Sequence, residues 1–237
     1  MNSQPDRIVA LLPMKANSTR VKGKNFRDFC GKPLFRWTLD TLLEVPNIDQ
    51  IIINTDARDI LTENGLKETN RILIRDRKPD ICGDDVSMNL ILADDVANIP
   101  ADIYLMTHTT NPLISAPTIT KAIAIFQKAK ECGDADSLFT VDKVQARFYR
   151  ADCSPVNHDP ENLIPTQYLE TWFEENSNLY LFSANSFAQT KARIGIKPIM
   201  LVTPLFESID IDTPDDWNFA VVAARFQQEQ VGINSAS

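Results

Sequence analysis

Five cations and no acid lie between Met14 and Arg27, in the sequence MKANSTRVKGKNFR, so this segment has a local charge of +5. The whole chain, by contrast, has a formal net charge of −8. Like charges that are crowded into a short segment repel one another unless an anion neutralises them. The segment is therefore a candidate phosphate site, and its cations are Lys15, Arg20, Lys22, Lys24 and Arg27.

The position of this segment favours phosphate binding. It follows an apolar run, Ile8–Leu12, that we expect to be a buried strand, and it precedes a helical pattern that starts at Leu34. Nucleotide phosphates usually bind in such a loop after the first strand of an open α/β sheet. A basic run is more often a solvated loop, but this position, and the Ser18, Gly23 and Asn25 among the cations, reverse that preference. The motifs GxxxxGK[ST] and GxGxxG are absent.

A pair of acids near the end of the chain could hold a cation. The segment Ser208–Asp212 has the pattern of a short strand, in which alternate side chains share a face. Ile209 and Ile211 would then point into the core, while Asp210 and Asp212 point together to the other side. Two such carboxylates can bind one divalent cation, and phosphate oxygens and water can complete its coordination. The alternative is that the acids cap the helix predicted from Thr213-Pro214.

Two further polar clusters are candidate site loops. The segment Arg75–Ser87 reads RDRKPDICGDDVS, and its alternative role is a surface turn that caps a helix. The segment Thr107–Leu113 reads THTTNPL and follows a predicted strand at Ile103–Met106. His108 in this segment fits a structural role and a substrate-contacting role equally well.

The elements that must position these loops alternate between strand and helix, which predicts a mostly parallel sheet with helices on both faces. Helical spacing of apolar residues follows Leu34, Val86, Ile119 and Pro214. The alternation breaks between Asp142 and Asn176, where prolines leave no period, and a long irregular segment in a compact domain is often functional. Besides the runs already named, the predicted strands are Asp49–Asn54, Arg71–Ile74, Ser137–Val141 and Asn178–Ser183.

The loop after the first strand resembles the signature of the CMP-sugar synthetases, the acylneuraminate cytidylyltransferase family, which runs roughly PARxxSKxxxxKNxxxxxGKPL. The matching residues are Pro13, Ser18, Lys24, Asn25, Gly31, Lys32, Pro33 and Leu34. Two positions depart from it, because Lys15 replaces an Arg and Thr19 replaces a Lys, and Arg20 could supply the missing charge. Downstream, Arg77 and Ser87 match a second motif, and Asp210 and Asp212 lie in a matching IDIDT.

The resemblance implies a role for each of these residues. Lys15, Arg20 and Lys24 would bind the phosphates of CTP in the catalytic site. Asp210 and Asp212 would hold Mg²⁺. The nucleotide would also be contacted by Pro13, Ser18, Asn25, Arg77, Ser87 and His108. The acceptor would be contacted by His108, Gln167 and Tyr180.

The resemblance also implies a three-layer α/β/α Rossmann-like nucleotidyltransferase fold. The whole chain, 1–237, would be one cytidylyltransferase domain, with 142–176 as an inserted arm that forms a homodimer and reaches the partner's substrate site. The arm's apolar residues, such as Leu169, Trp172 and Phe173, fit a dimer contact.

Composition excludes other classes of protein. An acidic chain lacks the broad basic surface that nucleic acid requires, so we expect no nucleic-acid partner. No apolar run is long enough to cross a membrane, and the first residues do not resemble a signal peptide. The four cysteines, Cys30, Cys82, Cys132 and Cys153, lack CxxC spacing and fit reduced thiols in the cytoplasm rather than a zinc site.

The sequence therefore predicts a CTP-dependent cytidylyltransferase that acts on a small acidic sugar, such as an N-acylneuraminate or a related nonulosonic acid, and releases pyrophosphate. One alternative is another acid acceptor, either a 3-deoxy-octulosonate or a phosphonate. A second alternative is a paralogue that binds a nucleotide without turning it over.

Overall fold

A seven-stranded sheet lies at the centre of the computed structural model, which describes residues 5–235. Its strand order is β5-β4-β1-β6-β8-β7-β9, and only β8 runs antiparallel to its neighbours. The strands are β1 (Ile8–Leu11), β4 (Gln50–Thr55), β5 (Ile72–Asp76), β6 (Ile103–Thr107), β7 (Ser137–Val144), β8 (Trp172–Phe182) and β9 (Pro198–Val202). The predicted mostly parallel sheet is therefore confirmed.

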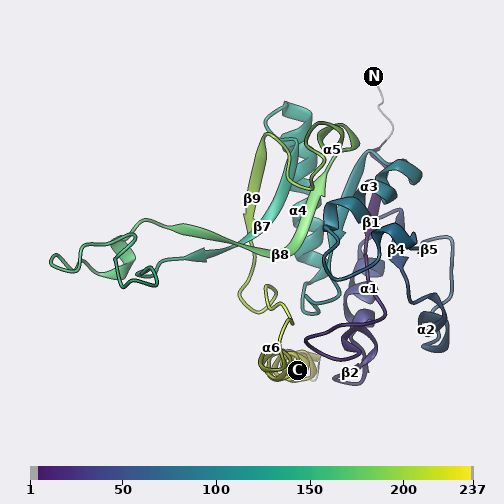
Figure 1. Cartoon of the computed structure of the whole chain (residues 1–237), viewed down its shortest axis with the longest axis horizontal. Helices are drawn as coiled ribbons and strands as arrows, with labels where there is room; N and C mark the ends of the chain where they lie inside the picture. The colour runs from purple at the N-terminus through teal and green to yellow at the C-terminus, as the bar shows by residue number, and fades with distance from the viewer. Residues whose placement is uncertain (1–4, 236–237) are drawn as a thin grey trace.

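The central strands are apolar on both faces because helices cover both sides of the sheet. Every residue of β1 and β6 is buried. The helices α1 (Leu34–Glu44) and α4 (Ala116–Cys132) pack on one face, through residues such as Leu39 and Phe126. On the other face lie α3 (Met88–Asn98) and α5 (Ala184–Thr190), through Leu92 and Phe187. These layers are visible in Figure 1 and confirm the three-layer fold.

A second apolar cluster joins the long last helix, α6 (Pro214–Ser235), to the loop after β1. That loop contains a small hairpin, β2 (Asp28–Phe29) with β3 (Lys32–Pro33). Phe29 is fully buried, and its ring lies edge-on to the ring of Trp217, with ring centroids 5.4 Å apart. Ile211 belongs to the same cluster, so this packing holds the loop after β1 against the segment that precedes α6.

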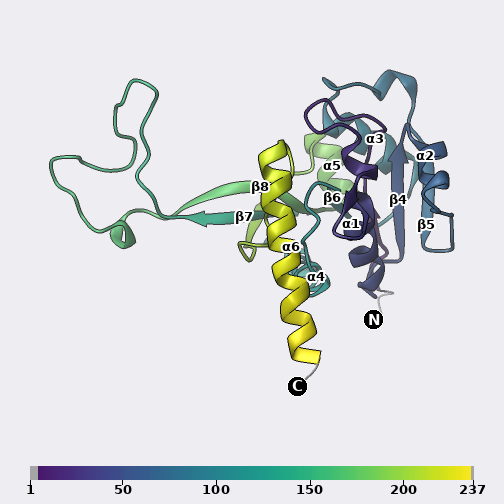
Figure 2. The same ribbon diagram turned by 90° about the horizontal axis from the view of Figure 1, so that it is seen from below.

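The strands β7 and β8 continue beyond the sheet as a two-stranded ribbon that carries an extended arm, as Figures 1 and 2 show. Between the strands, residues 145–171 form loops and one short 3₁₀ helix at Thr166–Tyr168. The predicted irregular segment at 142–176 coincides with this arm. However, β8 begins at Trp172, six residues before the predicted strand, because the ribbon pairs Trp172 with Val144.

The strand predicted at Ser208–Asp212 is wrong, because these residues form an extended loop outside the sheet. The sheet edge is occupied instead by β9, which the sequence did not predict and which pairs with β7. The helix α2 (Arg58–Glu63) lies between β4 and β5, and α5 and the β2–β3 hairpin were not predicted. The expected alternation nevertheless persists in the loop, since Ile209 and Ile211 are buried and Asp210 and Asp212 are half-buried.

Within residues 5–235, the helices are all too short or too polar to cross a bilayer. The four cysteines, which all lie in this part of the chain, are free thiols, with Cys132 and Cys153 exposed.

Candidate active site

A cavity of about 380 Å³ opens where the parallel strands end. The loops after β1, β5 and β6 meet there, together with the middle of β8 and the segment before α6. The charged and polar residues that line it include Lys15, Ser18, Thr19, Arg20, Lys24, Asn25, Arg77, Asp84, His108, Thr109, Thr110, Ser177, Arg193, Asp210 and Asp212. Segments that lie far apart in the sequence thus provide a single charged site.

The loop after β1 is held in place by hydrogen bonds to its neighbours. The guanidinium of Arg77 donates from Nη2 to the carbonyl of Met14 at 3.0 Å. The side-chain amide of Asn25 donates to the carbonyl of Lys15 at 2.9 Å and accepts from the Thr109 hydroxyl at 2.7 Å. Asn25 and Arg77 are both buried, so their main contribution is to fix the shape of the loop that carries the cations.

Each of the three cations predicted to bind phosphate faces an oxygen of the protein. Lys15 pairs with Asp84, and Arg20 donates from Nη2 to Asp212 at 3.0 Å. Lys24 is buried, donates to the main-chain carbonyl of Ile211, and lies 3.5 Å from the Asp212 carboxylate. Burial lowers the pKa of Lys24, while Asp212 and Asp210 oppose this shift. The cationic loop and the acid pair therefore lie side by side in the structure.

Asp210 and Asp212 have different surroundings, because Asp212 faces two cations and Asp210 is the more buried acid. Burial raises the pKa of Asp210, and the negative charge of Asp212 adds to this effect, while a hydrogen bond from Thr110 and the charge of Lys24 oppose it. The Oδ1 atom of Asp210 is buried and has no hydrogen-bond partner among the described residues. A buried carboxylate oxygen without a donor beside a second carboxylate suits a divalent cation.

The acids do not cap α6. That role belongs to Asp216, whose carboxylate accepts hydrogen bonds from the main-chain N–H of Asp212 at 3.1 Å and of Thr213 at 2.7 Å. The Thr213 hydroxyl in turn accepts from the N–H of Asp216 at 3.2 Å, which completes a reciprocal cap. The side chains of Asp210 and Asp212 therefore remain available to the cavity.

The candidate cation site has two protein carboxylates only. Within residues 5–235, the structure contains no group of three or more His, Cys, Asp or Glu side chains arranged to hold a metal ion. A cation bound between Asp210 and Asp212 would therefore require oxygens from outside the protein, such as those of phosphate and water.

Three of the predicted site residues lie outside the cavity. Ser87 is exposed at the N-cap of α3, and Gln167 lies in the arm, where its carbonyl accepts from Gln145. Tyr180 is fully buried in β8, so it cannot contact a substrate directly. The prediction placed these residues by motif alone, whereas the direction of a side chain and the path of the arm depend on tertiary packing. Pro13, Ser18 and His108 do line the cavity.

His108 is held as a neutral imidazole. Burial and the positive charges of Arg193 and Lys24 lower its pKa to about 3. Its Nε2 atom lies 3.4 Å from Nη1 of Arg193. A base with so low a pKa is weak at neutral pH, so the geometry favours hydrogen bonding over proton abstraction for this residue.

Two residues that line the cavity were not predicted as site residues. Arg193 lies in the segment between α5 and β9. Ser177 lies in the middle of β8 and has a positive φ of 54°. No motif or periodic pattern marks Arg193. The only available signal was a basic residue close to Gly195 in the segment KARIG.

A parallel sheet whose strand ends enclose a cavity of basic loops and paired carboxylates defines a nucleotide-binding α/β protein of the transferase type. The cytidylyltransferase family model matches residues 9–212. The chain belongs to this cytidylyltransferase family, and it is a nucleotidyltransferase that uses CTP. The resemblance noted in the sequence is thereby confirmed.

Similar proteins differ in their acceptors. The chain is 25% identical to the CMP-N,N'-diacetyllegionaminic acid synthase of Legionella pneumophila, over 94% of this chain and 98% of that protein. A solved CMP:2-keto-3-deoxy-manno-octonic acid synthetase in complex with CTP is similar with a TM-score of 0.63 and 17% identity, over 94% of this chain and 99% of the other. A 4-diphosphocytidyl-2C-methyl-D-erythritol synthase from Anaerococcus prevotii has a TM-score of 0.66 and 15% identity, over 94% and 100%. Both structures show that the fold is shared.

Proposed function

We propose that the protein transfers CMP from CTP to an acidic sugar, a nonulosonic acid, and releases pyrophosphate. The observation that carries this proposal is the contact between the cationic loop and the acid pair in one cavity, where Arg20 and Lys24 meet Asp212. Membership of the cytidylyltransferase family supports the use of CTP. The acceptor class is supported by similarity to a synthase named for a legionaminic acid.

In the proposed reaction, an oxygen of the acidic sugar attacks the α-phosphate of CTP, and pyrophosphate leaves with the electron pair of the broken P–O bond. Lys15, Arg20 and Lys24 bind the triphosphate and neutralise charge that develops on its oxygens. These cations would exchange their acidic partners for phosphate oxygens. The protein's other contribution is to align the two reactants in the cavity.

Mg²⁺ is the proposed cofactor, and Asp210 and Asp212 would hold it. The Asp210 oxygen that has no hydrogen-bond partner among the described residues supports this assignment. When bound, the ion supplies charge neutralisation to the phosphate oxygens. It also explains why two carboxylates border a phosphate site, because bare carboxylates would repel a triphosphate.

For the nucleotide, we propose contacts from Pro13, Ser18 and His108, which line the cavity. Asn25 and Arg77 act chiefly through the loop that they hold. Selectivity for cytidine can be measured by thermal shift with the four nucleoside triphosphates and Mg²⁺. We expect CTP to raise the melting temperature most, and equal shifts with ATP or GTP would contradict the assignment.

The test of the function is pyrophosphate release from CTP across a panel of acids. The panel contains N-acetylneuraminate, a legionaminic acid, 3-deoxy-manno-octulosonate and a phosphonate. We expect the highest turnover with a nonulosonic acid. Preference for 3-deoxy-manno-octulosonate or the phosphonate would select the first alternative acceptor class. Tight CTP binding without release on any acid would instead indicate a paralogue that does not catalyse transfer.

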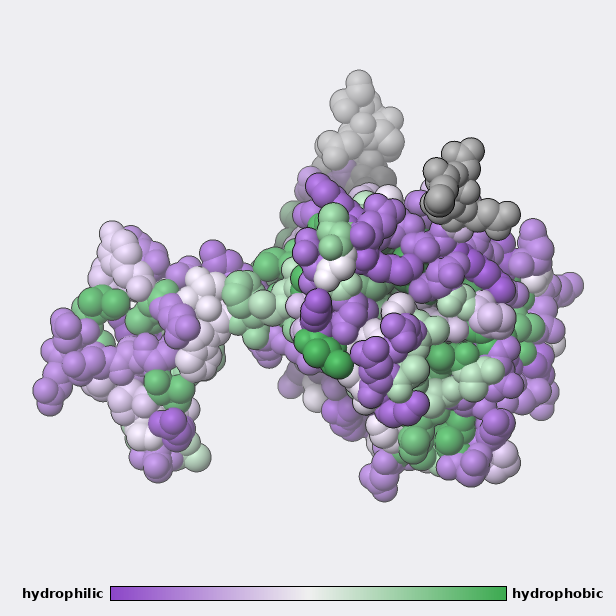
Figure 3. Space-filling model, turned by 90° about the horizontal axis from the view of Figure 1, so that it is seen from above, coloured by the Kyte–Doolittle hydropathy of each residue, from purple (hydrophilic) through white to green (hydrophobic). Residues whose placement is uncertain are grey.

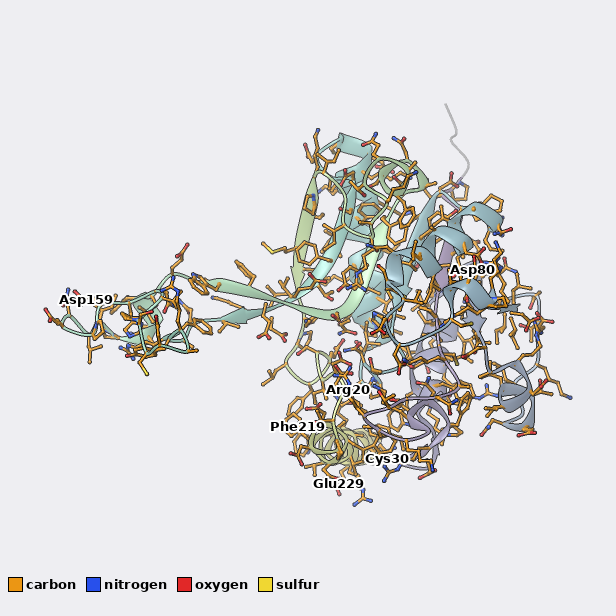
Figure 4. The ribbon with its side chains drawn as sticks, viewed as in Figure 1. Arg20, Cys30, Asp80, Asp159, Phe219 and Glu229 are labelled. Atoms are coloured by element: carbon orange, nitrogen blue, oxygen red, sulfur yellow. The ribbon has the colours of Figure 1, made fainter. Side chains whose placement is uncertain are left out.

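We also propose that the protein is a homodimer formed through the arm at 142–176. Leu163 and Tyr168 lie in the arm and expose 64% and 70% of their surface. Figure 3 shows hydrophobic residues between hydrophilic ones on the arm, and Figure 4 places Asp159 at its far end. Leu169, which the sequence offered as a contact, is buried within the arm, so it supports the arm's own structure instead.

Exposed apolar side chains on an isolated arm are a common feature of interfaces between chains. Light scattering should report a dimer at micromolar concentration. Replacing Leu163 and Tyr168 together by Ser should shift the protein toward monomers, while Asp159→Ser, on the same arm, should leave the dimer intact. A wild-type monomer would contradict this proposal.

We also propose that the protein is located in the cytoplasm. Its four cysteines are free thiols, which is typical of a reducing compartment.

A further inference from the structure

The segment between α5 and β9, residues 191–197, is held firmly against the rest of the sheet. Both carboxylate oxygens of Asp136 accept main-chain hydrogen bonds from it, from Ile196 at 2.8 Å and from Lys197 at 3.0 Å. The Ser137 hydroxyl accepts from the N–H of Gly195 at 2.8 Å. A Cβ atom at Gly195 would lie 2.3 Å from an Asp136 oxygen, so the segment can approach this closely only with glycine there.

This anchored segment projects Arg193 into the cavity. The Arg193 guanidinium lies over the ring of Tyr180, with its central carbon 3.8 Å from the ring centroid. Stacking on an aromatic face fixes the plane of the guanidinium and leaves its edge free to bind a planar anion. Tyr180 is fully buried and cannot contact a substrate itself, but it positions Arg193, which does line the cavity.

The donors of Arg193 are used unequally. Its Nη2 atom donates to Glu175 at 3.2 Å. Its Nη1 atom has only long contacts, at 3.4 Å to Nε2 of His108 and 4.0 Å to the sulfur of Met106. Charged hydrogen bonds of arginine to carboxylates are normally about 2.7–2.9 Å long. The Nη1 edge therefore retains the capacity to bind an anion in the cavity.

Arg193 pairs with a different acid from the cations of the proposed triphosphate site. Its partner is Glu175 of β8, whereas Arg20 lies close to α6, as Figure 4 shows. The cations Arg20 and Lys24 face Asp212, and Arg193 makes no contact with either aspartate. One cavity thus offers two separate cationic positions, while the proposed reaction joins two anionic substrates.

We propose that Arg193 binds the carboxylate of the acidic acceptor and thereby determines that the acceptor must be an acid. This inference rests on the proposed function and deepens it. Nε2 of His108 lies 3.4 Å from Nη1 of Arg193, so an uncharged imidazole stands beside the edge that would meet the acid. Glu175 moderates the charge of Arg193, and Tyr180 also donates a hydrogen bond to Glu175.

The test compares Michaelis constants for the two substrates in pyrophosphate release, with CTP and the acid that wild type uses best. Arg193→Gln should raise the KM for the acid roughly ten- to a hundredfold, the value of a charged hydrogen bond, and should leave the KM for CTP within about twofold. The KM of Arg193→Lys for the acid should lie between the values of the wild type and of Arg193→Gln. Arg225→Gln, an exposed arginine on α6, is the matched control and should behave as wild type.

A second variant should change the KM for the acid in the opposite direction. Glu175→Gln retains an acceptor for Tyr180 but removes the negative charge beside Arg193, so the KM for the acid should fall below the wild-type value. Melting temperatures of all variants show whether they fold. An unchanged acid KM in folded Arg193→Gln, or an equal rise in the CTP KM, would overturn the inference while the proposed function stands. If wild type uses none of the acids with CTP, the proposed function itself fails, and the inference fails with it.

Discussion

Two pairs of aspartates lie near the carboxyl edge of the sheet, and their surroundings differ. Asp94 and Asp95 are adjacent residues of α3, with side chains 6% and 0% exposed, and Arg75 pairs with both of them. Asp210 and Asp212 are two residues apart in a loop and face the cavity. The first pair does not line the cavity, and Arg75 and Lys78 neutralise it in the interior. In the second pair, the side chain of Asp212 is 41% exposed and lies beside Arg20 and Lys24, two of the cations of the loop after β1.

The difference shows how the fold separates structural acids from candidate ligands. Asp95 also accepts a hydrogen bond from Asn54 at 2.8 Å, and Asn54 accepts from Arg77 at 3.0 Å. The buried pair is therefore connected, through Asn54, to the arginine that holds the loop after β1. Removing its charge balance should destabilise the fold, while changing the second pair should affect the reaction.

The largest expected effect is on stability, from Arg75→Met. This change leaves Asp95 buried without its cationic partner, and breaking a buried ion pair on one side costs about 3–5 kcal/mol. Urea unfolding should report a loss of this size. Arg36→Met, on the half-exposed surface of α1, is the control and should cost far less. A loss below about 1 kcal/mol for Arg75→Met would mean that Asp95 does not depend on Arg75.

The second effect is on turnover, from Asp210→Asn and Asp212→Asn. Each change keeps the shape of the side chain and removes the charge proposed to hold Mg²⁺, so kcat should fall at least ~100-fold, as for removal of a key electrostatic group. The melting temperature of Asp210→Asn should not fall, because burial disfavours the ionised carboxylate there. Asp80→Asn, exposed and outside the cavity, is the control. Near-normal turnover at limiting Mg²⁺ in both variants would contradict the metal assignment.

The third effect is the pH dependence of stability. Burial raises the pKa of Asp95 from 3.8 to about 6, against the opposing effects of Asn54 and Arg75. Between these two values the folded protein keeps a proton that the unfolded chain has released, so the free energy of unfolding should fall as the pH rises from about 4 to about 6. In Asp95→Asn, the decrease in the free energy of unfolding over this pH range should be smaller than in the wild type by on the order of 1–3 kcal/mol. Parallel pH curves for the variant and the wild type, from urea unfolding, would show that Asp95 does not titrate in this range.

The smallest effect is on CTP affinity, from Lys15→Met and Arg20→Ala. Each residue is partly exposed and paired with an aspartate, so it must exchange this partner for a phosphate oxygen. We expect roughly tenfold weaker CTP binding by calorimetry, since a charged hydrogen bond contributes about 1.5–3 kcal/mol. Lys128→Met on α4 provides the control. If both variants bind CTP as the wild type does, the loop after β1 is not the phosphate site.

Local pattern was sufficient for much of the fold. The apolar runs at Ile8 and Ile103 became buried central strands, and the helical spacing after Leu34 and Ile119 became helices on one face of the sheet. The order of these elements also indicated a parallel sheet, because short connections between strand and helix allow little else. Short or edge elements such as β9 were missed, since Pro198–Val202 is half exposed and its pairing with β7 is decided by a neighbour distant in sequence.

For the site, the sequence by itself determined that the basic loop and His108 follow strands of a mostly parallel sheet, and therefore that they meet at one edge. The acid pair reaches the same place from a loop outside the sheet, which the sequence did not indicate. The sequence also determined the family, through the spacing of residues such as Lys24, Asn25 and Asp212. These features depend on the chain's local order and on the rule that the carboxyl ends of parallel strands share an edge.

Only the tertiary structure decided the partners. It paired Arg20 with Asp212, which is 192 residues away in the sequence. It also buried Tyr180 beneath Arg193 and placed Gln167 on the arm outside the cavity. It also separated Asp95, which pairs with Arg75 in the interior, from Asp210 and Asp212, which line the cavity. The physical reason is that burial and charge pairing are properties of three-dimensional neighbours, which the local sequence around an aspartate does not fix.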